Sequence, residues 1–247
     1  MNVIKRDGTA EPLNLDKIHQ MVEFACEDIT GVSSSQVEMN SGLQFFDGIE
    51  SEQIQNILIK SASDLISLDS PNYQFVAARL LLFSVRKQVF PEWNQTGYPK
   101  LKDHVKTCAE VGVYDGGILK KYDDQEWEEL NSYIDHQRCY GFTYAGLRQI
   151  VDKYLVQDRS TGKVYETPQY MYIMVAATLF QDYPKETRLD YVKRYYTATS
   201  KGKINVPTPV LAGVRTPLRQ FASCVLVDVD DTLDSIFTSD MAIGRYV

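Results

Sequence analysis

The C-terminal part of the sequence carries acidic, hydroxyl and thiol side chains at spacings that suggest chemistry. Asp228-Val229-Asp230-Asp231-Thr232 has the pattern D-x-D-x-T and directly follows the apolar run CVLV. Neighbouring carboxylates can supply a nucleophile and a group that transfers protons. Cys224 lies four residues before Asp228, and a thiol at that place could serve in redox chemistry if a second thiol met it. One short stretch therefore has two chemical interpretations.

The D-x-D-x-T pattern resembles the motif of haloacid-dehalogenase-type phosphatases, but its surroundings disfavour that function. In those enzymes the motif follows an early strand of an α/β fold, and later segments supply a lysine and further metal-binding acids. Only fifteen residues follow Thr232, and they contain neither a lysine nor another strand-like run. Because short motifs often match by chance, an acidic loop at a strand end remains the alternative interpretation. The default for a lone cysteine in a strand is likewise an inert apolar side chain.

A second candidate site lies near the N-terminus, where cations cluster around expected helix starts. Lys5 and Arg6 belong to a hairpin just before Asn14, and Lys17 falls in the first turn of the helix that Asn14 caps. The N-terminus of a helix presents unpaired N–H groups and the positive end of its dipole. Ser51 at another helix start and Arg86-Lys87 at a helix end add a hydroxyl and more charge. The combination predicts a site for a small phosphorylated ligand, against the alternative of a solvated basic rim.

Composition and cysteine spacing limit the class of protein to which the chain can belong. The chain has 247 residues, 44% of them hydrophobic and 24% charged, with a formal net charge of −7. These values are typical of a globular protein and disfavour a broad nucleic-acid-binding surface. The N-terminus lacks the apolar core of a signal peptide. The apolar run Met171–Phe180 is too short to span a bilayer and is expected to be a buried helix. The four cysteines lie far apart with no metal-ligand spacing, so we expect a reducing, cytoplasmic location.

The elements that must position these residues are mostly helical up to residue 203. The segment VIKRDGTAEPL predicts a hairpin with a turn at Asp7-Gly8. Helical periodicity follows after Asn14, around residues 34–41, from Ser51, and over residues 72–89. Residues 101–200 predict further helices, with Pro168 and Pro184 at helix starts, Gly202 at a helix end, and a small hairpin at DRSTGKVYE.

The sequence changes its character from Ile204. INVPTPVLAGV and FASCVLVDV are β-type runs, and TLDSIFTSDMAIGRYV has the periodicity of a helix. We therefore expect the opening of an α/β domain here.

The motifs together resemble a known family. KRDGxxExxN with Lys17 and Ile18 resembles the ATP cone, a regulatory nucleotide-binding domain. PNYQFVAARLLLFSVRK, KETRLDYVKRYY, NVPTPVLAGVRTPLRQFASCVL and DTLDSI resemble the N-terminal part of the large (alpha, catalytic) subunit of class Ia ribonucleoside-diphosphate reductase. The similarity covers essentially the whole chain. It implies a mostly α fold with α/β parts: an ATP cone over residues 1–92, made of helices and a small β-hairpin cap, a helical domain over 93–203, and over 204–247 the first strands of a ten-stranded α/β barrel.

The resemblance also implies roles for individual residues. It implies an allosteric activity site that distinguishes ATP from dATP. This site would be formed by Lys5, Arg6, Glu11, Asn14, Leu15, Lys17, Ser51 and Lys87. Gln55 and Ser84 stand where the enterobacterial pattern has histidines. The substrate diphosphate would be bound by Thr208 and Ser223, and Cys224 would be one of the two redox thiols. The allosteric specificity site would include Asp231, Thr232 and Leu233.

The implied function is reduction of ribonucleoside diphosphates to deoxyribonucleoside diphosphates for DNA synthesis. The effectors would be ATP, dATP and other deoxynucleotides with Mg²⁺, with no tightly bound cofactor in this chain. A separate small subunit would hold a diiron-tyrosyl radical, thioredoxin or glutaredoxin would recycle the disulfide, and the large subunit would dimerise. Because the thiyl-radical cysteine and the second redox cysteine are absent from the sequence, the chain is expected to be a fragment or one piece of a split large subunit. The alternative is a non-catalytic ATP-binding regulatory or decoy subunit.

Overall fold

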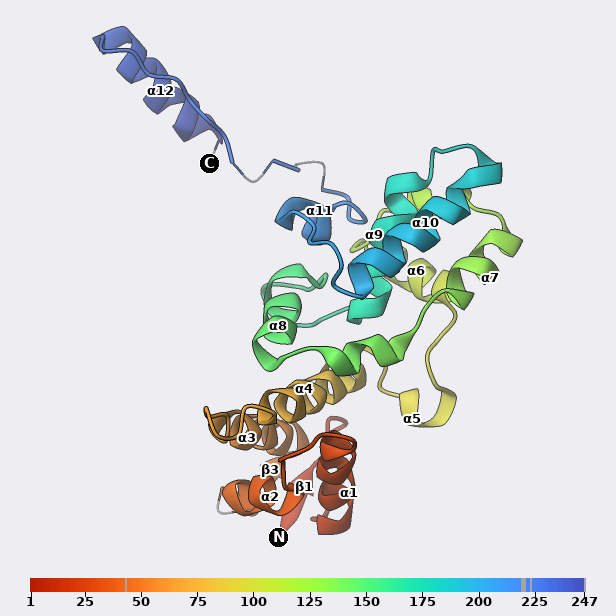
Figure 1. The fold of residues 1–247 in the computed structure, drawn as a ribbon, viewed down its shortest axis with the longest axis vertical. Coiled ribbons are helices and arrows are strands. Elements are labelled where there is room, and N and C mark those ends of the chain that lie inside the picture. Colours follow the sequence, from red (N-terminus) through yellow and green to blue (C-terminus); the bar gives the residue numbers. More distant parts are fainter. Residues whose placement is uncertain (43, 219–220, 223, 247) are drawn as a thin grey trace.

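The computed structural model describes residues 1–42, 44–218, 221–222 and 224–246. The described chain is mainly helical, with one small sheet near the N-terminus. The first four helices and the sheet form one end of the body, with α5 beside them, and the helices from α6 to α11 form the other end (Figure 1). The last helix, α12, projects away from both (Figure 1). The buried apolar side chains form one continuous core that runs from Val3 to Val214.

The sheet has three strands in the order β2-β1-β3. The predicted hairpin is confirmed: β1 (Asn2–Ile4) pairs antiparallel with β2 (Ala10–Pro12), and Gly8 in the turn has a φ of +83°. A left-handed φ of this kind favours glycine, because it has no Cβ. β3 (Ile49–Glu50) adds to the other edge of β1 in parallel, which the sequence analysis did not predict.

Four helices pack around this sheet. They are α1 (Leu15–Cys26), α2 (Ser34–Gly42), α3 (Ser51–Asp64) and α4 (Tyr73–Val89). Asn14 caps α1 as predicted, since its side-chain Oδ1 accepts a hydrogen bond from the Lys17 N–H at 3.0 Å. α3 and α4 lie against each other, and Val76, Leu80, Phe83 and Val85, which recur at helical spacing in α4, are buried. Ile66 lies beyond the end of α3 and is exposed.

Shorter elements connect α4 to the C-terminal pair of long helices. They are α5 (Trp93–Thr96), α6 (Leu101–Glu110), η1 (Gly116–Lys120), α7 (Asp124–Ser132), η2 (His136–Gly141), α8 (Tyr144–Gln149) and η3 (Ile150–Tyr154). α4 packs against α8 and η2, and so joins the two ends of the body. The small hairpin predicted at DRSTGKVYE is reduced to a single bridge between Gln157 and Val164.

The long helices α9 (Pro168–Phe180) and α10 (Lys185–Ser200) lie against each other. Residues Pro168 to Ala177 of α9 are all buried, which agrees with the prediction that this apolar run is a core helix. Gly202 follows α10 with a φ of +65°, as expected of a glycine that ends a helix.

The β-type runs predicted after Ile204 are not strands. Thr208–Gly213 form a helix, α11, because Pro207 and Pro209 suit a helix start, where a missing N–H costs nothing. Residues 221–222 and 224–229 have no strand partner among the described residues, and isolated extended chain does not make a sheet. The described chain after Ile204 therefore consists of α11 and an irregular extended segment that leads to the last helix, and the expected barrel strands are not part of it.

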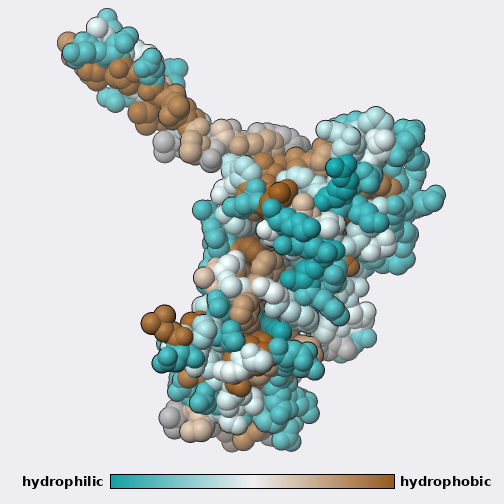
Figure 2. Space-filling view, in the orientation of Figure 1, coloured by the Kyte–Doolittle hydropathy of each residue, from teal (hydrophilic) through white to brown (hydrophobic). Residues whose placement is uncertain are grey.

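The predicted C-terminal helix is confirmed as α12 (Leu233–Tyr246). Apolar side chains lie along one side of it and are largely exposed (Figure 2). They include Leu233, Ile236, Phe237 and Met241.

Candidate functional site

An open cavity of about 600 Å³ lies among the β1–β2 hairpin, α1, the start of α3 and the end of α4. The hairpin supplies Lys5 and Glu11 to its wall, and the capped first turn of α1 supplies Asn14 and Lys17. Ser51 and Lys87 come from α3 and α4. The fold thus gathers in one wall six side chains that lie up to 82 residues apart in the sequence and that were predicted to form one site.

Two further predicted residues lie at the margin of this cavity. Leu15 is 63% exposed and lines an adjoining shallow depression that also borders on Glu11, Asn14 and Lys17. Arg6 is exposed and does not line either hollow, but its charge acts on Lys87 inside the cavity. Gln55 lines the cavity, whereas Ser84 does not.

The polar wall of the cavity is rich in cations. The ammonium of Lys5 lies 2.7 Å from a Glu11 carboxylate oxygen, and that of Lys17 lies 3.7 Å from the same oxygen. The hydrogen bond from Lys5 is the main cause of the lowered pKa of Glu11. The pKa of Lys87 is also lowered, first by partial desolvation of its ammonium and then by Arg6, Lys5 and Lys17, although the residue as a whole is exposed. A bound anion would relieve this repulsion.

The inner wall is apolar and aromatic, and the sequence analysis did not predict it. Phe24 and Phe83 meet with ring centroids 5.6 Å apart, and Met21 and Ile54 extend the same surface. The helical periodicity assigned Phe83 to the core, and nothing in the sequence pattern showed that one edge of that core is open. An apolar wall facing a cationic one suits a ligand with a flat ring at one end and phosphates at the other.

Arg86, which the sequence indicated together with Lys87 as charge at a helix end, is a buried cation in the cavity wall. It lines the cavity with only 5% of its surface exposed, and its Nε has no hydrogen-bond partner among the described residues. Its guanidinium group lies over the Trp93 ring, and one Nη donates to the Tyr140 hydroxyl at 3.4 Å. The sequence shows charge at this helix end in both Arg86 and Lys87, but it does not show that Arg86 is buried while Lys87 is exposed.

The second predicted group of residues is spread out. Thr208 begins α11 and is half-buried, with its hydroxyl oxygen 3.4 Å from that of Tyr154. Ser223 lies outside the described residues. Cys224 is exposed on the extended segment that leads to α12, and Asp231, Thr232 and Leu233 are exposed at the start of that helix. The described chain by itself does not build a closed pocket around these residues.

The D-x-D-x-T stretch forms the entry to α12. The Thr232 hydroxyl accepts a hydrogen bond from the Ser235 N–H at 3.2 Å, and the Asp230 N–H donates to the Ser235 hydroxyl at 2.8 Å. The Ser239 hydroxyl lies 3.4 Å from the Asp228 carbonyl oxygen. The contacts of Thr232 and Ser235 are typical of a helix start, and they explain these hydroxyl residues without phosphatase chemistry.

The described residues contain neither a cluster of metal ligands nor a membrane-spanning helix. No three histidine, cysteine or acidic side chains there form a group that could hold a metal ion. Within the same residues, no helix is both long and apolar enough to cross a membrane.

The chain is similar to known proteins along nearly its whole length. Residues 1–88 match the ATP cone domain, and residues 140–219 match the ribonucleotide reductase all-alpha domain. Over 245 residues, or 99% of its length, the chain is 51% identical to ribonucleoside-diphosphate reductase subunit alpha of Haemophilus influenzae. It is 50% identical over the same length to ribonucleoside-diphosphate reductase 1 subunit alpha of Escherichia coli, and 39% identical over 249 residues to subunit alpha of Enterobacteria phage T4. The chain spans about a third of the length of these relatives, 32% of each.

Proposed function

We propose that this chain, which is similar throughout its length to ribonucleotide reductase alpha subunits and carries an ATP cone, forms the nucleotide-sensing part of a ribonucleoside-diphosphate reductase. The reaction is the reduction of ribonucleoside diphosphates to deoxyribonucleoside diphosphates. The chain supplies the effector site and part of the substrate site. The remainder of the large subunit, a second large subunit and a radical-generating small subunit supply the rest.

The N-terminal cavity carries the proposal. Its cationic wall of Lys5, Lys17 and Lys87 suits the phosphates of ATP or dATP with Mg²⁺, and its aromatic wall suits the purine ring. Arg6 is near enough to add to the same field. Glu11 and Asn14 offer acceptor oxygens for the amino and hydroxyl groups of the nucleoside. The hydroxyl of Ser51 adds a further donor for a phosphate oxygen. Together these residues bind the nucleotide effector.

In the proposed reaction Cys224 is one of the two thiols that reduce the substrate, and its partner thiol belongs to the remainder of the large subunit. Two thiolates together give up two electrons as they join in a disulfide, which thioredoxin or glutaredoxin then reduces. Thr208 and Ser223 hydrogen-bond the substrate diphosphate. Asp231, Thr232 and Leu233 contribute to the specificity site, near the contact between two large subunits.

Nucleotide binding is tested by titrating the full chain with ATP and dATP in a calorimeter. Lys87→Met should weaken both affinities about tenfold, because one charge-assisted contact to phosphate contributes about 1.5 kcal/mol. The matched control is Lys121→Met, which removes a lysine that pairs with Asp182 far from the cavity and should leave both affinities unchanged. Equal affinities for the wild type and the Lys87→Met variant would contradict the assignment of the cavity.

The redox role is tested in the reconstituted reductase. Cys224→Ser should abolish turnover with either a dithiol or thioredoxin as reductant and leave ATP binding intact. Retained turnover would exclude Cys224 from the reduction. If the wild-type chain binds ATP but restores no turnover to the other subunits, the chain is a regulatory subunit instead.

A further inference from the structure

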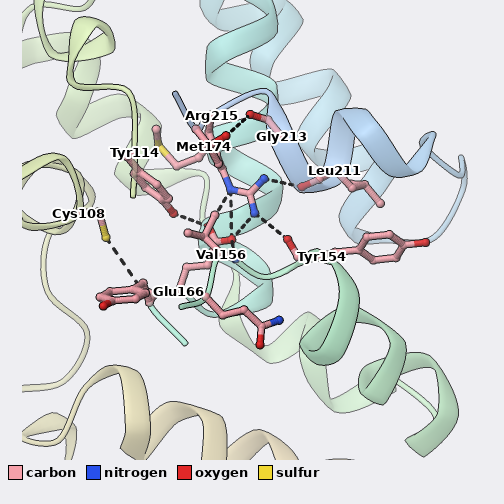
Figure 3. Close-up of polar contacts among 12 residues, drawn as sticks. Cys108, Tyr114, Tyr154, Val156, Glu166, Met174, Leu211, Gly213 and Arg215 are labelled. Atoms are coloured by element: carbon pink, nitrogen blue, oxygen red, sulfur yellow. Dashed lines mark hydrogen bonds and ion pairs between the residues drawn. The ribbon is translucent and has the colours of Figure 1, made fainter. Parts of the chain in front are cut away.

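Thr208 lies at the start of α11, a helix of only six residues, so its position depends on how α11 is held. The clearest anchor is Arg215, two residues beyond the end of that helix. The Arg215 and Glu166 side chains are both fully buried and form an ion pair. This pair lies between α11 and the segment that precedes α9 (Figure 3).

The Arg215 guanidinium joins three segments of the chain. Its Nε donates to the Glu166 carboxylate at 2.8 Å, and one Nη donates to the same carboxylate. That Nη also donates to the Tyr154 carbonyl oxygen at the end of η3, at 3.0 Å, and the other Nη donates to the Leu211 carbonyl oxygen within α11 (Figure 3). The fork of the guanidinium thus ties α11 to η3 through backbone atoms.

The Glu166 carboxylate also accepts hydrogen bonds from groups other than Arg215. The donors are the Tyr114 hydroxyl and, at 2.7 Å, the Val156 N–H. The Arg215 carbonyl oxygen in turn accepts from the Asp115 N–H at 2.9 Å. Both the guanidinium and the carboxylate therefore form hydrogen bonds with neighbouring segments as well as with each other. Such a network fixes a buried ion pair in one geometry.

Tyr154 links this network to Thr208. Its carbonyl oxygen accepts from Arg215, while its hydroxyl lies 3.4 Å from the Thr208 hydroxyl and accepts from the Gln149 side chain at 3.3 Å. One residue thus contacts both Arg215 and the first side chain of α11. A purely apolar contact would pack α11 as well, since buried ion pairs are often replaceable by apolar residues without loss of stability. An apolar contact, however, does not fix the orientation of α11 as hydrogen bonds do.

We propose that Glu166 and Arg215 are positioning residues for the substrate site: through Leu211 and Tyr154 they hold the Thr208 hydroxyl in place before substrate binds. The inference rests on the proposed role of Thr208 in binding the substrate diphosphate. It adds that this role depends on a buried pair that does not touch the substrate. Preorganised donors bind and orient a ligand without a cost for ordering them.

The test measures kcat and KM for cytidine diphosphate in the reductase reconstituted from this chain and its partner subunits. Arg215→Lys keeps the charge but loses the fork, and Thr208→Val keeps the shape of the side chain but loses the hydroxyl. Each variant should raise KM at least fivefold with a smaller change in kcat. The double variant should be no worse than Thr208→Val alone, because a misplaced hydroxyl and a missing one have the same consequence.

Three results would overturn the inference. If Arg215→Lys lowers kcat at unchanged KM, the pair only maintains the amount of folded protein. If the two KM effects multiply in the double variant, the residues act independently. If Thr208→Val leaves KM unchanged, the substrate role of Thr208 is wrong, while ATP binding and the Cys224→Ser result still decide the proposed function separately.

Tyr154→Phe keeps the test decisive if Arg215→Lys fails to fold. It removes only the hydroxyl that faces Thr208 and should raise KM about threefold, with no further effect when Thr208→Val is present. The matched control is Tyr195→Phe on α10, which should leave KM unchanged. An unchanged KM in Tyr154→Phe would contradict the inference.

Discussion

The guanidinium carbon of Arg86 lies 4.4 Å from the centroid of the Trp93 ring, and both side chains line the N-terminal cavity. A cation that is removed from water over an indole ring contributes about 2 kcal/mol. We therefore expect Arg86→Met to lower the free energy of unfolding by about 2 kcal/mol, measured by urea denaturation of the full chain. The control, Arg194→Met, changes an exposed arginine 5.9 Å from the Tyr191 ring and should cost less than about 0.5 kcal/mol. Equal losses of unfolding free energy in the two variants would contradict the prediction that burial strengthens the contact between the cation and the ring.

Asn14 has two separable roles, as the cap of α1 and as part of the cavity wall. Asn14→Ala should lower the free energy of unfolding by about 1 kcal/mol, because the Lys17 N–H loses its acceptor. Asn14→Ser should restore most of that stability, since serine also caps helices. ATP affinity should stay reduced in Asn14→Ser, which lacks the amide. If serine restores affinity as well, Asn14 acts only as a cap.

The Glu126–Arg188 pair joins α7 to α10 and is nearly buried. Arg188 Nε lies 2.7 Å from one Glu126 carboxylate oxygen and an Nη lies 2.5 Å from the other. Arg188→Met leaves the carboxylate without its counterion and should cost about 3 kcal/mol in thermal or urea unfolding. Glu126→Gln combined with Arg188→Met should recover part of that loss. The exposed Lys121–Asp182 pair is the control, and breaking it should cost less than about 0.5 kcal/mol.

Stability should depend on pH through two histidines. Burial lowers the pKa of His104 and of His136 to about 4, with Glu166 opposing the shift of His104 and Arg86 adding to that of His136. The unfolded chain takes up these protons near pH 6.5, but the folded chain does so only near pH 4. The stabilisation is therefore complete above pH 6.5 and is lost as the pH falls towards 4, by about 3 kcal/mol for each histidine.

His104→Phe isolates this effect, because a phenyl ring can keep the contacts with Phe90 and Tyr170. The variant should show a shallower fall in unfolding free energy between pH 6.5 and 4. His19 is the control with the opposite sign: its hydrogen bond to Glu38 raises its pKa, so its contribution is present at low pH and is lost above pH 6.5. His19→Gln should leave the acid slope of the wild type unchanged. An unaltered slope in His104→Phe would contradict the prediction.

The sequence determined the local structure of the chain well. Asn14 before an apolar-periodic run, Asp7-Gly8 between short strands, and the solid apolar run of α9 each specify their element through contacts within a few residues. The cationic members of the cavity were also predicted, because they lie at hairpin and helix ends where charge is conspicuous. Thr232, by contrast, is part of a phosphatase-like motif, yet its hydroxyl accepts from the Ser235 N–H at the start of α12.

Tertiary structure decided what depends on distant partners. The runs after Ile204 have β propensity, but strands need neighbours to pair with, and the described chain offers none. Arg86 was visible in the sequence as charge at a helix end, but its burial depends on tertiary structure. The same holds for the pairing of Glu166 with Arg215, which lie 49 residues apart in sequence. Periodicity reports which side of an element is apolar, whereas the opening of a cavity and the pairing of two buried charges depend on which elements meet. The cavity and the buried ion pair are set by the packing of distant elements, so they can be seen only in the folded structure.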